Sequence, residues 1–299
     1  SRNMIRSIFL SKQALDKGQG RPAGQKGEDV KRIAVIGAGF MGAGIATVSA
    51  QAGIEVVLID VDQAGADKGK QHAMDYFAKG VKRGKLTEDK AAKLADLITP
   101  SADYALLKDV DLVVEAVFEN SELKHKITKM AEEHMPKDAI FGSNTSTIPI
   151  TSLAEASSRP EQFVGIHFFS PVEKMMLVEI IHGEKTGDFV TKIKKTPIIV
   201  SDTRGFYCNR CVMRFAEQGM AMLSEGYKPA LIENGARMAG MPMGPMELMD
   251  MTAIDLGWKI QQQTKKDLGD AYVPSKSDPI IDTMYELGRY GQKTKKGFY

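Results

Sequence analysis

Two ionisable residues, His167 and Glu179, interrupt apolar stretches at residues 164–169 and 177–181. Burying either side chain without a partner would cost several kcal/mol. If neighbouring strands bring the two together, the carboxylate orients one imidazole nitrogen and makes the ring more basic, so the other nitrogen can accept a proton. The pattern is typical either of a general base with its orienting carboxylate or of a buried pair that only satisfies its own hydrogen bonds.

A second stretch, residues 32–60, contains the pattern G-x-G-x-x-G at Gly37, Gly39 and Gly42. In such a motif the first glycine permits a tight turn, the second lets the backbone approach a pyrophosphate, and the third lets helix and strand pack closely. The N–H groups at the start of the following helix favour phosphate. An apolar strand pattern precedes the motif, and a small-residue helix and a second strand follow it. This order predicts a dinucleotide site rather than a simple glycine-rich turn.

Asp60 ends the second of these strands and indicates which dinucleotide binds. A carboxylate at this position can accept hydrogen bonds from both hydroxyls of an adenosine ribose, and it would repel a 2′-phosphate. The next residue, Val61, is not the arginine that NADP sites use. We therefore predict that the cofactor is NAD.

Two domains must position these residues, because 299 residues exceed what one hydrophobic core usually holds. Strand and helix patterns alternate as far as residue 201, and helical patterns predominate afterwards. We predict an N-terminal helix and linker at 1–28, a Rossmann-type α/β NAD-binding domain at 29–201 and an all-α C-terminal domain at 202–299. The helices expected in the last domain span residues 207–225, 228–239, 245–268 and 279–290.

Composition argues against several other classes of protein. Hydrophobic residues make up 43% of the chain and charged residues 26%, with a net charge of +2, so nucleic acid or membrane partners are not indicated. The sequence shows no apolar run of membrane-spanning length and no signal peptide. Cys208 and Cys211 form a lone C-x-x-C, which we interpret as two small residues on a helix face rather than a metal site. No metal is expected.

The helical region that follows Asp60 is basic, with Lys68, Lys70, Lys79 and Lys82 among its residues. A solvated helix face and an electrostatic landing surface for an anionic ligand both fit this pattern. The strand pattern at residues 111–117 ends close to Glu119, in the region where α/β proteins place ligand contacts.

Several motifs together resemble the 3-hydroxyacyl-CoA dehydrogenase family, and the likeness covers residues 30–299 in the family's order. The segments that carry it are residues 37–46, 114–120, 143–146, 165–171, 202–210 and 242–245. The resemblance implies an NAD-dependent oxidoreductase that converts an L-3-hydroxyacyl-CoA to a 3-ketoacyl-CoA in fatty-acid β-oxidation, a lipid-degrading pathway of fatty acid metabolism.

The resemblance also implies roles for individual residues. His167 is the catalytic base and Glu179 its orienting partner, Ser146 lies beside the substrate hydroxyl and the nicotinamide, and Asn209 reaches the substrate carbonyl. The cofactor-binding positions that it implies are Gly37, Gly39, Met41, Gly42, Asp60, Glu119, Lys124 and Ser146.

Residues 6–10 are similar to the tether that follows the enoyl-CoA hydratase module in multifunctional β-oxidation α-subunits. We therefore expect the dehydrogenase portion of such an enzyme, as a homodimer or packed against another module, in the cytoplasm or, in a eukaryote, in mitochondria or peroxisomes. Ser170 stands where the family usually has asparagine. The segment from 183 to 196 is shorter than the family's helix, so we expect that residues are missing between Asp188 and Phe189.

Two other functions are compatible with parts of the pattern. A β-hydroxyacid dehydrogenase shares the opening glycine motif but uses a lysine base, and the block from His167 to Glu179 argues against it. A crystallin-like structural homologue would be catalytically silent. Retention of His167, Glu179, Ser146 and Asn209 favours catalysis.

Overall fold

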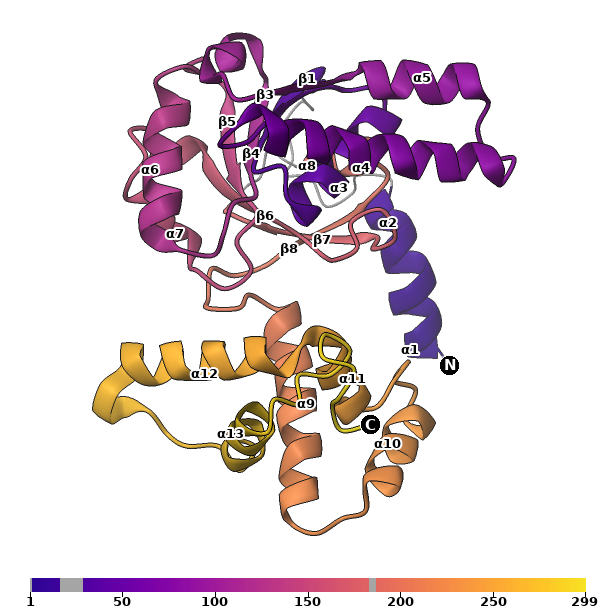
Figure 1. The fold of residues 1–299 in the computed structure, drawn as a ribbon, viewed down its shortest axis with the longest axis vertical. Helices are drawn as coiled ribbons and strands as arrows, with labels where there is room; N and C mark the ends of the chain where they lie inside the picture. The colour runs from indigo at the N-terminus through magenta and orange to yellow at the C-terminus, as the bar shows by residue number, and fades with distance from the viewer. Residues whose placement is uncertain (1, 17–28, 183–186) are drawn as a thin grey trace. The chain divides into compact units, whose positions relative to one another are not determined.

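The computed structural model describes residues 2–16, 29–182 and 187–299, coloured along the chain in Figure 1. The chain divides into two units, Ser1–Tyr207 and Cys208–Tyr299. The first unit contains the sheet and the second is helical, so the predicted fold class is confirmed. The predicted linker at residues 17–28 lies outside the described residues.

Within the described residues, the first unit is built on an eight-stranded sheet with the order β3-β2-β1-β4-β5-β6-β7-β8. Strands β6 and β7 pair antiparallel, and the other neighbouring pairs are parallel. The strand order reverses beside β1, and in such sheets ligands bind beyond the carboxyl ends of the strands at this reversal. The strands are β1 (Arg32–Ile36), β2 (Glu55–Ile59), β3 (Ile98–Ser101), β4 (Leu112–Glu115), β5 (Ile140–Ser143), β6 (Phe163–Phe168), β7 (Leu177–Ile181) and β8 (Thr196–Ile199).

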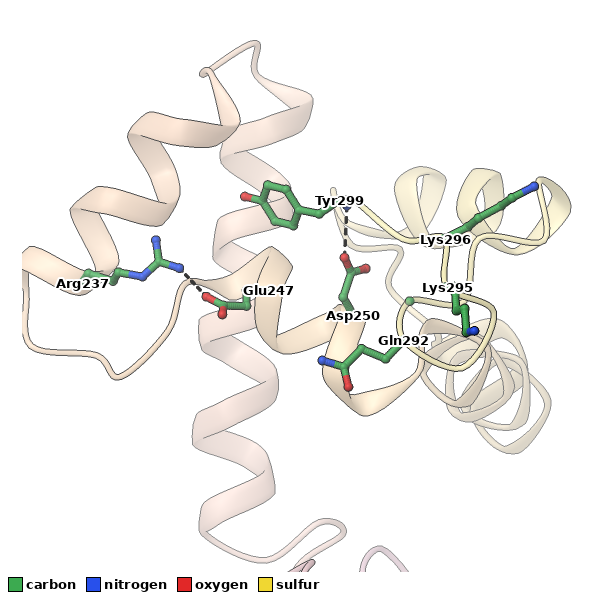
Figure 2. A pocket seen from close by; sticks show the side chains of 8 residues that line it. Arg237, Glu247, Asp250, Gln292, Lys295, Lys296 and Tyr299 are labelled. Carbon is green, nitrogen blue, oxygen red and sulfur yellow. Dashed lines mark hydrogen bonds and ion pairs between the residues drawn. The ribbon is translucent and has the colours of Figure 1, made fainter.

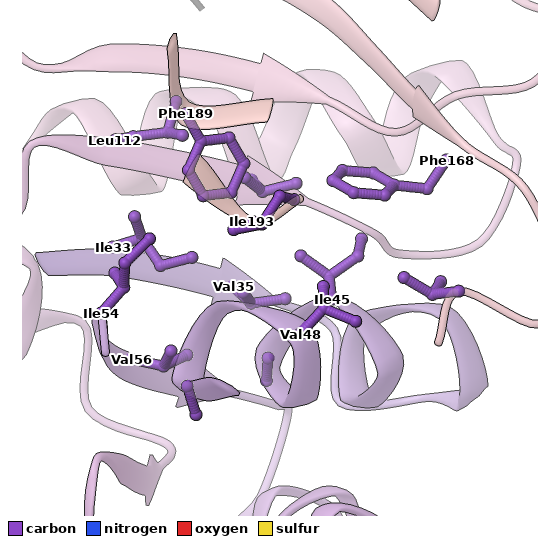
Figure 3. Packing of buried hydrophobic residues seen from close by; sticks show 14 of the residues in the cluster. Ile33, Val35, Ile45, Val48, Ile54, Val56, Leu112, Phe168, Phe189 and Ile193 are labelled. Carbon is purple, nitrogen blue, oxygen red and sulfur yellow. The ribbon is translucent and has the colours of Figure 1, made fainter. Parts of the chain in front are cut away.

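Apolar side chains cover both faces of this sheet, because successive residues of a strand point to opposite sides. Ile33 and Val35 of β1 belong to one buried cluster, and Ala34 and Ile36 belong to the other. Figure 3 shows the first cluster, in which Ile45 packs toward β1. The helices of this unit are α3 (Phe40–Gln51), α4 (Gln63–Lys82), α5 (Glu88–Asp96), α6 (Ser121–Glu132), α7 (Ile150–Ala154) and α8 (Gly187–Lys192), with short 3-10 turns at η2 (Tyr104–Asp109) and η3 (Pro160–Gln162).

The short helix α8 forms the crossover between the parallel strands β7 and β8. Phe189 and Val190 of this helix are buried, so even a brief helix covers this part of the sheet. Our expectation that residues are missing between Asp188 and Phe189 stays a prediction.

The N-terminal segment is helical, as predicted. It consists of α1 (Arg2–Met4), the π-helical η1 (Ile5–Ser11) and α2 (Lys12–Asp16). The side of this helix that carries Ile5, Phe9 and Leu10 is exposed, whereas α2 contacts β8. Within the described residues, no helix combines the length and the apolar character that crossing a bilayer requires.

The second unit has a small apolar core that includes Met220, Met249, Ile254 and Ile281. Methionines here fill core positions in part, while Met238 is almost fully exposed. The helices of this unit are α9 (Cys208–Ser224), α10 (Pro229–Met238), α11 (Pro245–Thr252), α12 (Ile254–Leu268) and α13 (Asp278–Glu286), with a short η4 (Gly269–Ala271).

The prediction of one helix over residues 245–268 is wrong, because the chain breaks at Ala253, whose φ is 68°. The break lets Met249 and Ile254, on either side of it, both enter the core. Asp250 also accepts hydrogen bonds from the backbone N–H groups of Phe298 and Tyr299, at 2.9 and 3.2 Å. The distant end of the chain therefore contributes to the packing at this corner.

Candidate active site

The antiparallel register of β6 and β7 places His167 directly opposite Glu179. Nδ1 of His167 lies 2.7 Å from Oε2 of Glu179, and the two residues are 4% and 0% exposed. An ionised carboxylate only accepts hydrogen bonds, so Nδ1 carries the donated hydrogen and Nε2 of the neutral ring keeps a lone pair. The structure thus brings together the two residues that the strand pattern singles out, in an arrangement that can accept a proton.

Aromatic rings confine the imidazole of His167. The ring of Phe169 lies 4.5 Å away, centre to centre, and that of Phe206 lies 5.7 Å away. Asn144, at the end of β5, accepts a hydrogen bond from the Phe168 backbone N–H at 2.8 Å. These contacts hold the end of β6 against its neighbours and limit rotation of the base.

The glycine-rich turn requires glycine at two of its positions. Gly37 has a φ of 99°, and a Cβ there would lie 2.7 Å from the Ala116 carbonyl oxygen. A Cβ on Gly42 would lie 1.7 Å from the Gly37 oxygen. A Cβ on Gly39, in contrast, would meet nothing within 4 Å. The loop is therefore closely packed from behind and open at Gly39, as the approach of a pyrophosphate requires.

Helix α3 begins directly after Gly39, which caps it without any side-chain hydrogen bond. The first N–H groups of such a helix are available to an anion, and the helix dipole favours negative charge there. Met41 lies in this first turn and is half-buried against the core. These features fit the phosphates of NAD.

Asp60 connects the glycine-rich turn to the end of β2. Its Oδ2 accepts a hydrogen bond from the Ala38 backbone N–H and its Oδ1 from the Val61 N–H, each at 2.7 Å. Each carboxylate oxygen has further lone-pair capacity, so the same group can accept ribose hydroxyls. Asp60 thus supports the turn, and its remaining acceptor capacity fits the ribose-binding role that the sequence predicts.

Glu119 organises the loop that carries Ser146. Its Oε1 accepts hydrogen bonds from the backbone N–H groups of Ser146 and Thr147, both at 2.9 Å, and from the Thr145 hydroxyl at 2.7 Å. The hydroxyl of Ser146 also lies 3.3 Å from this oxygen. Burial alone would raise the pKa of Glu119, but Lys124 and these hydrogen bonds outweigh it and hold the pKa below its ordinary value.

Lys124 is buried between two carboxylates. Its Nζ lies 2.8 Å from Oε1 of Glu115 and 3.5 Å from Oε2 of Glu119. Glu115 also accepts hydrogen bonds from the Ser143 hydroxyl at 2.7 Å and the Val117 N–H at 2.8 Å. Sequence reasoning missed Glu115, although it gives the same signal as His167: an ionisable residue inside an apolar strand.

Other predicted residues lie in less defined surroundings. Asn209 is in the first turn of α9, in the second unit, and its contact with substrate stays a prediction. Ser170 comes after Phe169, just beyond the end of β6, and is exposed. Cys208 and Cys211 are thiols rather than a disulfide. In the described part of the chain, no group of His, Cys, Asp and Glu could hold a metal ion.

A hollow of about 460 Å³ lies on the second unit, between α10, α11 and the end of the chain (Figure 2). Its described lining residues, among them Arg237, Glu247 and Asp250, are outside the set of predicted site residues. Arg237 and Glu247 form an ion pair with each other, and Asp250 is bonded to backbone N–H groups. The charges of these three side chains are therefore partnered within the protein.

Both parts of the chain match descriptions of one protein family. Residues 32–203 match the model of the 3-hydroxyacyl-CoA dehydrogenase NAD binding domain, and residues 205–299 match that of the 3-hydroxyacyl-CoA dehydrogenase C-terminal domain.

Solved structures of similar proteins agree with this match. (S)-3-hydroxybutyryl-CoA dehydrogenase PaaH1 from Ralstonia eutropha is 34% identical, with a TM-score of 0.83 over 91% of this chain and 99% of its own. 3-Hydroxybutyryl-CoA dehydrogenase from Escherichia coli K12 is 30% identical, with a TM-score of 0.84 over 91% of this chain and 60% of its own. The dehydrogenase part of multifunctional enzyme 1 from C. elegans is 28% identical, with a TM-score of 0.61 over 97% of this chain and 70% of its own.

Proposed function

We propose that this chain, which belongs to the 3-hydroxyacyl-CoA dehydrogenase family and uses NAD, oxidises L-3-hydroxyacyl-CoA. In this proposal His167 is the general base. The buried contact between His167 and Glu179 is the observation that carries this assignment. Because Glu179 holds Nδ1, the lone pair of Nε2 is available to the hydroxyl proton of the substrate. A crystallin-like silent homologue would have no need to keep this pair.

The proposed reaction has a simple balance. Nε2 of His167 takes the proton of the 3-hydroxyl, the hydrogen on C3 leaves as hydride, and the C3–O bond becomes the carbonyl of a 3-ketoacyl-CoA. NAD, when bound, accepts the hydride and supplies the redox chemistry. The residues of this chain bind and orient the substrate and the cofactor, and His167 accepts the proton. The negative charge of Glu179 favours the imidazolium that forms at His167.

Ser146 is assigned to orientation of the substrate hydroxyl and nicotinamide. Its loop is held by Glu119 through two backbone N–H groups, which supports a fixed position for the Ser146 side chain. Asn209 is assigned to the substrate carbonyl. We assign cofactor binding to Gly37, Gly39, Met41, Gly42, Asp60, Glu119, Lys124 and Ser146, of which Glu119 and Lys124 act at least in part through the Ser146 loop.

The L configuration of the substrate follows by similarity to the Ralstonia protein, which is an (S)-3-hydroxybutyryl-CoA dehydrogenase. We further propose that the enzyme works in fatty-acid β-oxidation beside other modules of a multifunctional protein. The C. elegans relative, the dehydrogenase part of such an enzyme, supports this. So does the N-terminal helix, on which Ile5 and Phe9 are 56% and 62% exposed. Apolar surface of this kind is normally covered by a partner.

Further apolar surface lies on the second unit, where Leu231, Met238 and Val273 are exposed. A second copy of the chain or another module could cover it, and we propose one of these as its partner. The proposed pathway implies that the protein works in the cytoplasm or, in a eukaryote, in mitochondria or peroxisomes.

The test is formation of NADH from purified protein with L-3-hydroxybutyryl-CoA and with L-3-hydroxypalmitoyl-CoA. The D isomers and free 3-hydroxyacids serve as controls. We expect turnover of at least one L-3-hydroxyacyl-CoA and none of the controls. Turnover confined to free hydroxyacids would favour a β-hydroxyacid dehydrogenase instead, and no turnover of any substrate by folded, NAD-binding protein would favour the silent homologue.

A further inference from the structure

The last residues of the first unit form an unusual turn. Gly205 and Phe206 are consecutive left-handed residues, with φ of 75° and 49°. A bulky aromatic residue with positive φ is a steric outlier, and such residues persist only where the surrounding structure holds them. They also cluster at functional sites, so the contacts of Phe206 can explain why the conformation is kept.

The segment that leads into this turn is anchored to the first unit. Asp202 accepts hydrogen bonds from the backbone N–H groups of Ile150 and Thr151, at 2.7 and 2.8 Å, at the start of α7. The Gly205 N–H points to the Thr147 carbonyl oxygen at 3.3 Å, in the loop that carries Ser146. The Phe206 N–H donates to the Thr203 oxygen at 2.8 Å. Asp202 and Gly205 therefore both tie the turn to residues 147–151, and the Phe206 bond closes the turn itself.

Phe206 places its own ring beside His167 and the next backbone N–H beside Glu179. Its side chain is 1% exposed, and its ring lies 5.7 Å from that of His167 at an interplanar angle of 51°. The next backbone N–H, that of Tyr207, donates to Oε1 of Glu179 at 3.1 Å. Glu179 thus receives the Tyr207 N–H on one oxygen and His167 on the other, at 2.7 Å.

We propose that Phe206 is a positioning residue of the dehydrogenase reaction, acting through the left-handed backbone that directs the Tyr207 N–H to Glu179. With that N–H in place, the carboxylate cannot rotate away from His167, and the imidazole keeps Nε2 directed as the base requires. In an extended or right-handed conformation at Phe206, the peptide that follows would turn and the N–H would leave the carboxylate. The proposal rests on the proposed function, in which His167 is the base.

Two substitutions distinguish the effect of the left-handed backbone at Phe206 from the effect of its ring. Phe206→Gly removes the ring but adopts positive φ freely, whereas Phe206→Ile keeps apolar bulk but strongly disfavours positive φ. We expect the glycine variant to lose more thermal stability because it leaves a larger cavity. We expect the isoleucine variant, in contrast, to lose more activity, with kcat at least about tenfold below that of the glycine variant. The KM for NAD and the Kd for NAD should be unchanged in both variants.

The matched control is Phe141→Ile, which replaces a buried phenylalanine of the same core in a strand. It should lower the melting temperature and leave kcat nearly unchanged. If Phe206→Ile does not fold, Phe206→Ala replaces it, because alanine lacks the ring as glycine does, but its Cβ still disfavours positive φ.

Failure of the positioning role of Phe206 and failure of the proposed function give different results. If kcat across the Phe206 variants follows the melting temperature, with glycine the least active, the ring acts only in packing and the positioning role is wrong. Measuring His167→Ala in the same assay tests the proposed function separately. If that variant keeps more than half of its activity, His167 is not the base, whatever the Phe206 variants do.

Discussion

His167 and Glu179 are twelve residues apart in the sequence and directly opposite each other across β6 and β7, with Nδ1 and Oε2 2.7 Å apart. Both side chains are buried, so neither has ready access to bulk water as an alternative partner. A buried carboxylate that holds one nitrogen of a histidine leaves the other for proton transfer. The first prediction concerns this pair.

Replacing His167 with alanine should abolish most turnover and leave NAD affinity intact, because the base acts only in the chemical step. Loss of a general base typically lowers the rate about 10²- to 10⁴-fold. Steady-state kinetics and NAD titration measure the two effects separately. His134→Ala, at an exposed position in the same unit, is the control and should behave as the unmodified protein. An active His167→Ala variant would make the pair purely structural.

Asp60 should determine cofactor choice. The unmodified enzyme should prefer NAD over NADP by at least about tenfold, or 1.4 kcal/mol. Asp60→Asn should raise the KM for NAD and reduce this preference, since the carboxylate that repels a 2′-phosphate is gone and the bond to Ala38 N–H is weakened. Asp62→Asn makes the same change two residues away at the cap of α4, and it should alter neither value. Comparable use of NAD and NADP by the unmodified enzyme would contradict the assignment.

Glu119→Gln should destabilise the protein in a pH-dependent manner. The pKa of Glu119 in the folded protein lies below its ordinary value of 4.5. The stabilisation is therefore fully present above about pH 4.5 and is lost as the pH falls through the lower, folded value. The difference in melting temperature between the unmodified protein and Glu119→Gln should be largest near neutral pH and shrink in acid.

The same Glu119→Gln variant should also lose activity at neutral pH, because the amide can no longer accept as strongly from the Ser146 and Thr147 N–H groups. Glu122→Gln, at an exposed position in the first turn of α6, provides the control. A stability difference that stayed constant from neutral pH to well below pH 4 would show that the charge of Glu119 does not contribute.

Deleting the residues before Lys26 should leave dehydrogenase turnover nearly unchanged. The predicted site residues all lie after this point, and the apolar side of the N-terminal helix is exposed. Some thermal stability should be lost, because α2 contacts β8. The measurement is kcat and NAD affinity of the shortened chain. Loss of NAD binding, or of most activity, would place the segment in the dehydrogenase core and weaken the multifunctional proposal.

Much of the first unit could be predicted from the sequence, because its signals are local. A run such as residues 33–36 can be assigned to a strand without knowledge of its neighbours. The glycine pattern at 37, 39 and 42 is read within one turn: Gly42 contacts the Gly37 oxygen, Gly37 has a positive φ, and Gly39 leaves the turn open. Asp60 follows from the end of the next strand. The helices of the second unit were also predictable from their periodicity, apart from the break at Ala253.

That break illustrates what a local pattern does not contain. Residues 245–268 have a continuous helical pattern, but Asp250 bonds to the backbone N–H of Phe298, 48 residues later. The energy that favours two helices over one comes from core packing and from this distant segment. Propensity is a weak influence beside such tertiary contacts.

By itself, the sequence determined that the chain has a dinucleotide site with an NAD-type acid and that His167 and Glu179 are ionisable residues in buried strands. Only the tertiary structure decided their pairing, because the register between two strands depends on non-local packing and a shift of one residue would turn each side chain to the other face. It also decided that Glu119 holds the Ser146 loop and that Phe206 directs a backbone N–H to Glu179. These contacts join segments that are far apart in the chain, so they stabilise the protein only after folding has brought the segments together.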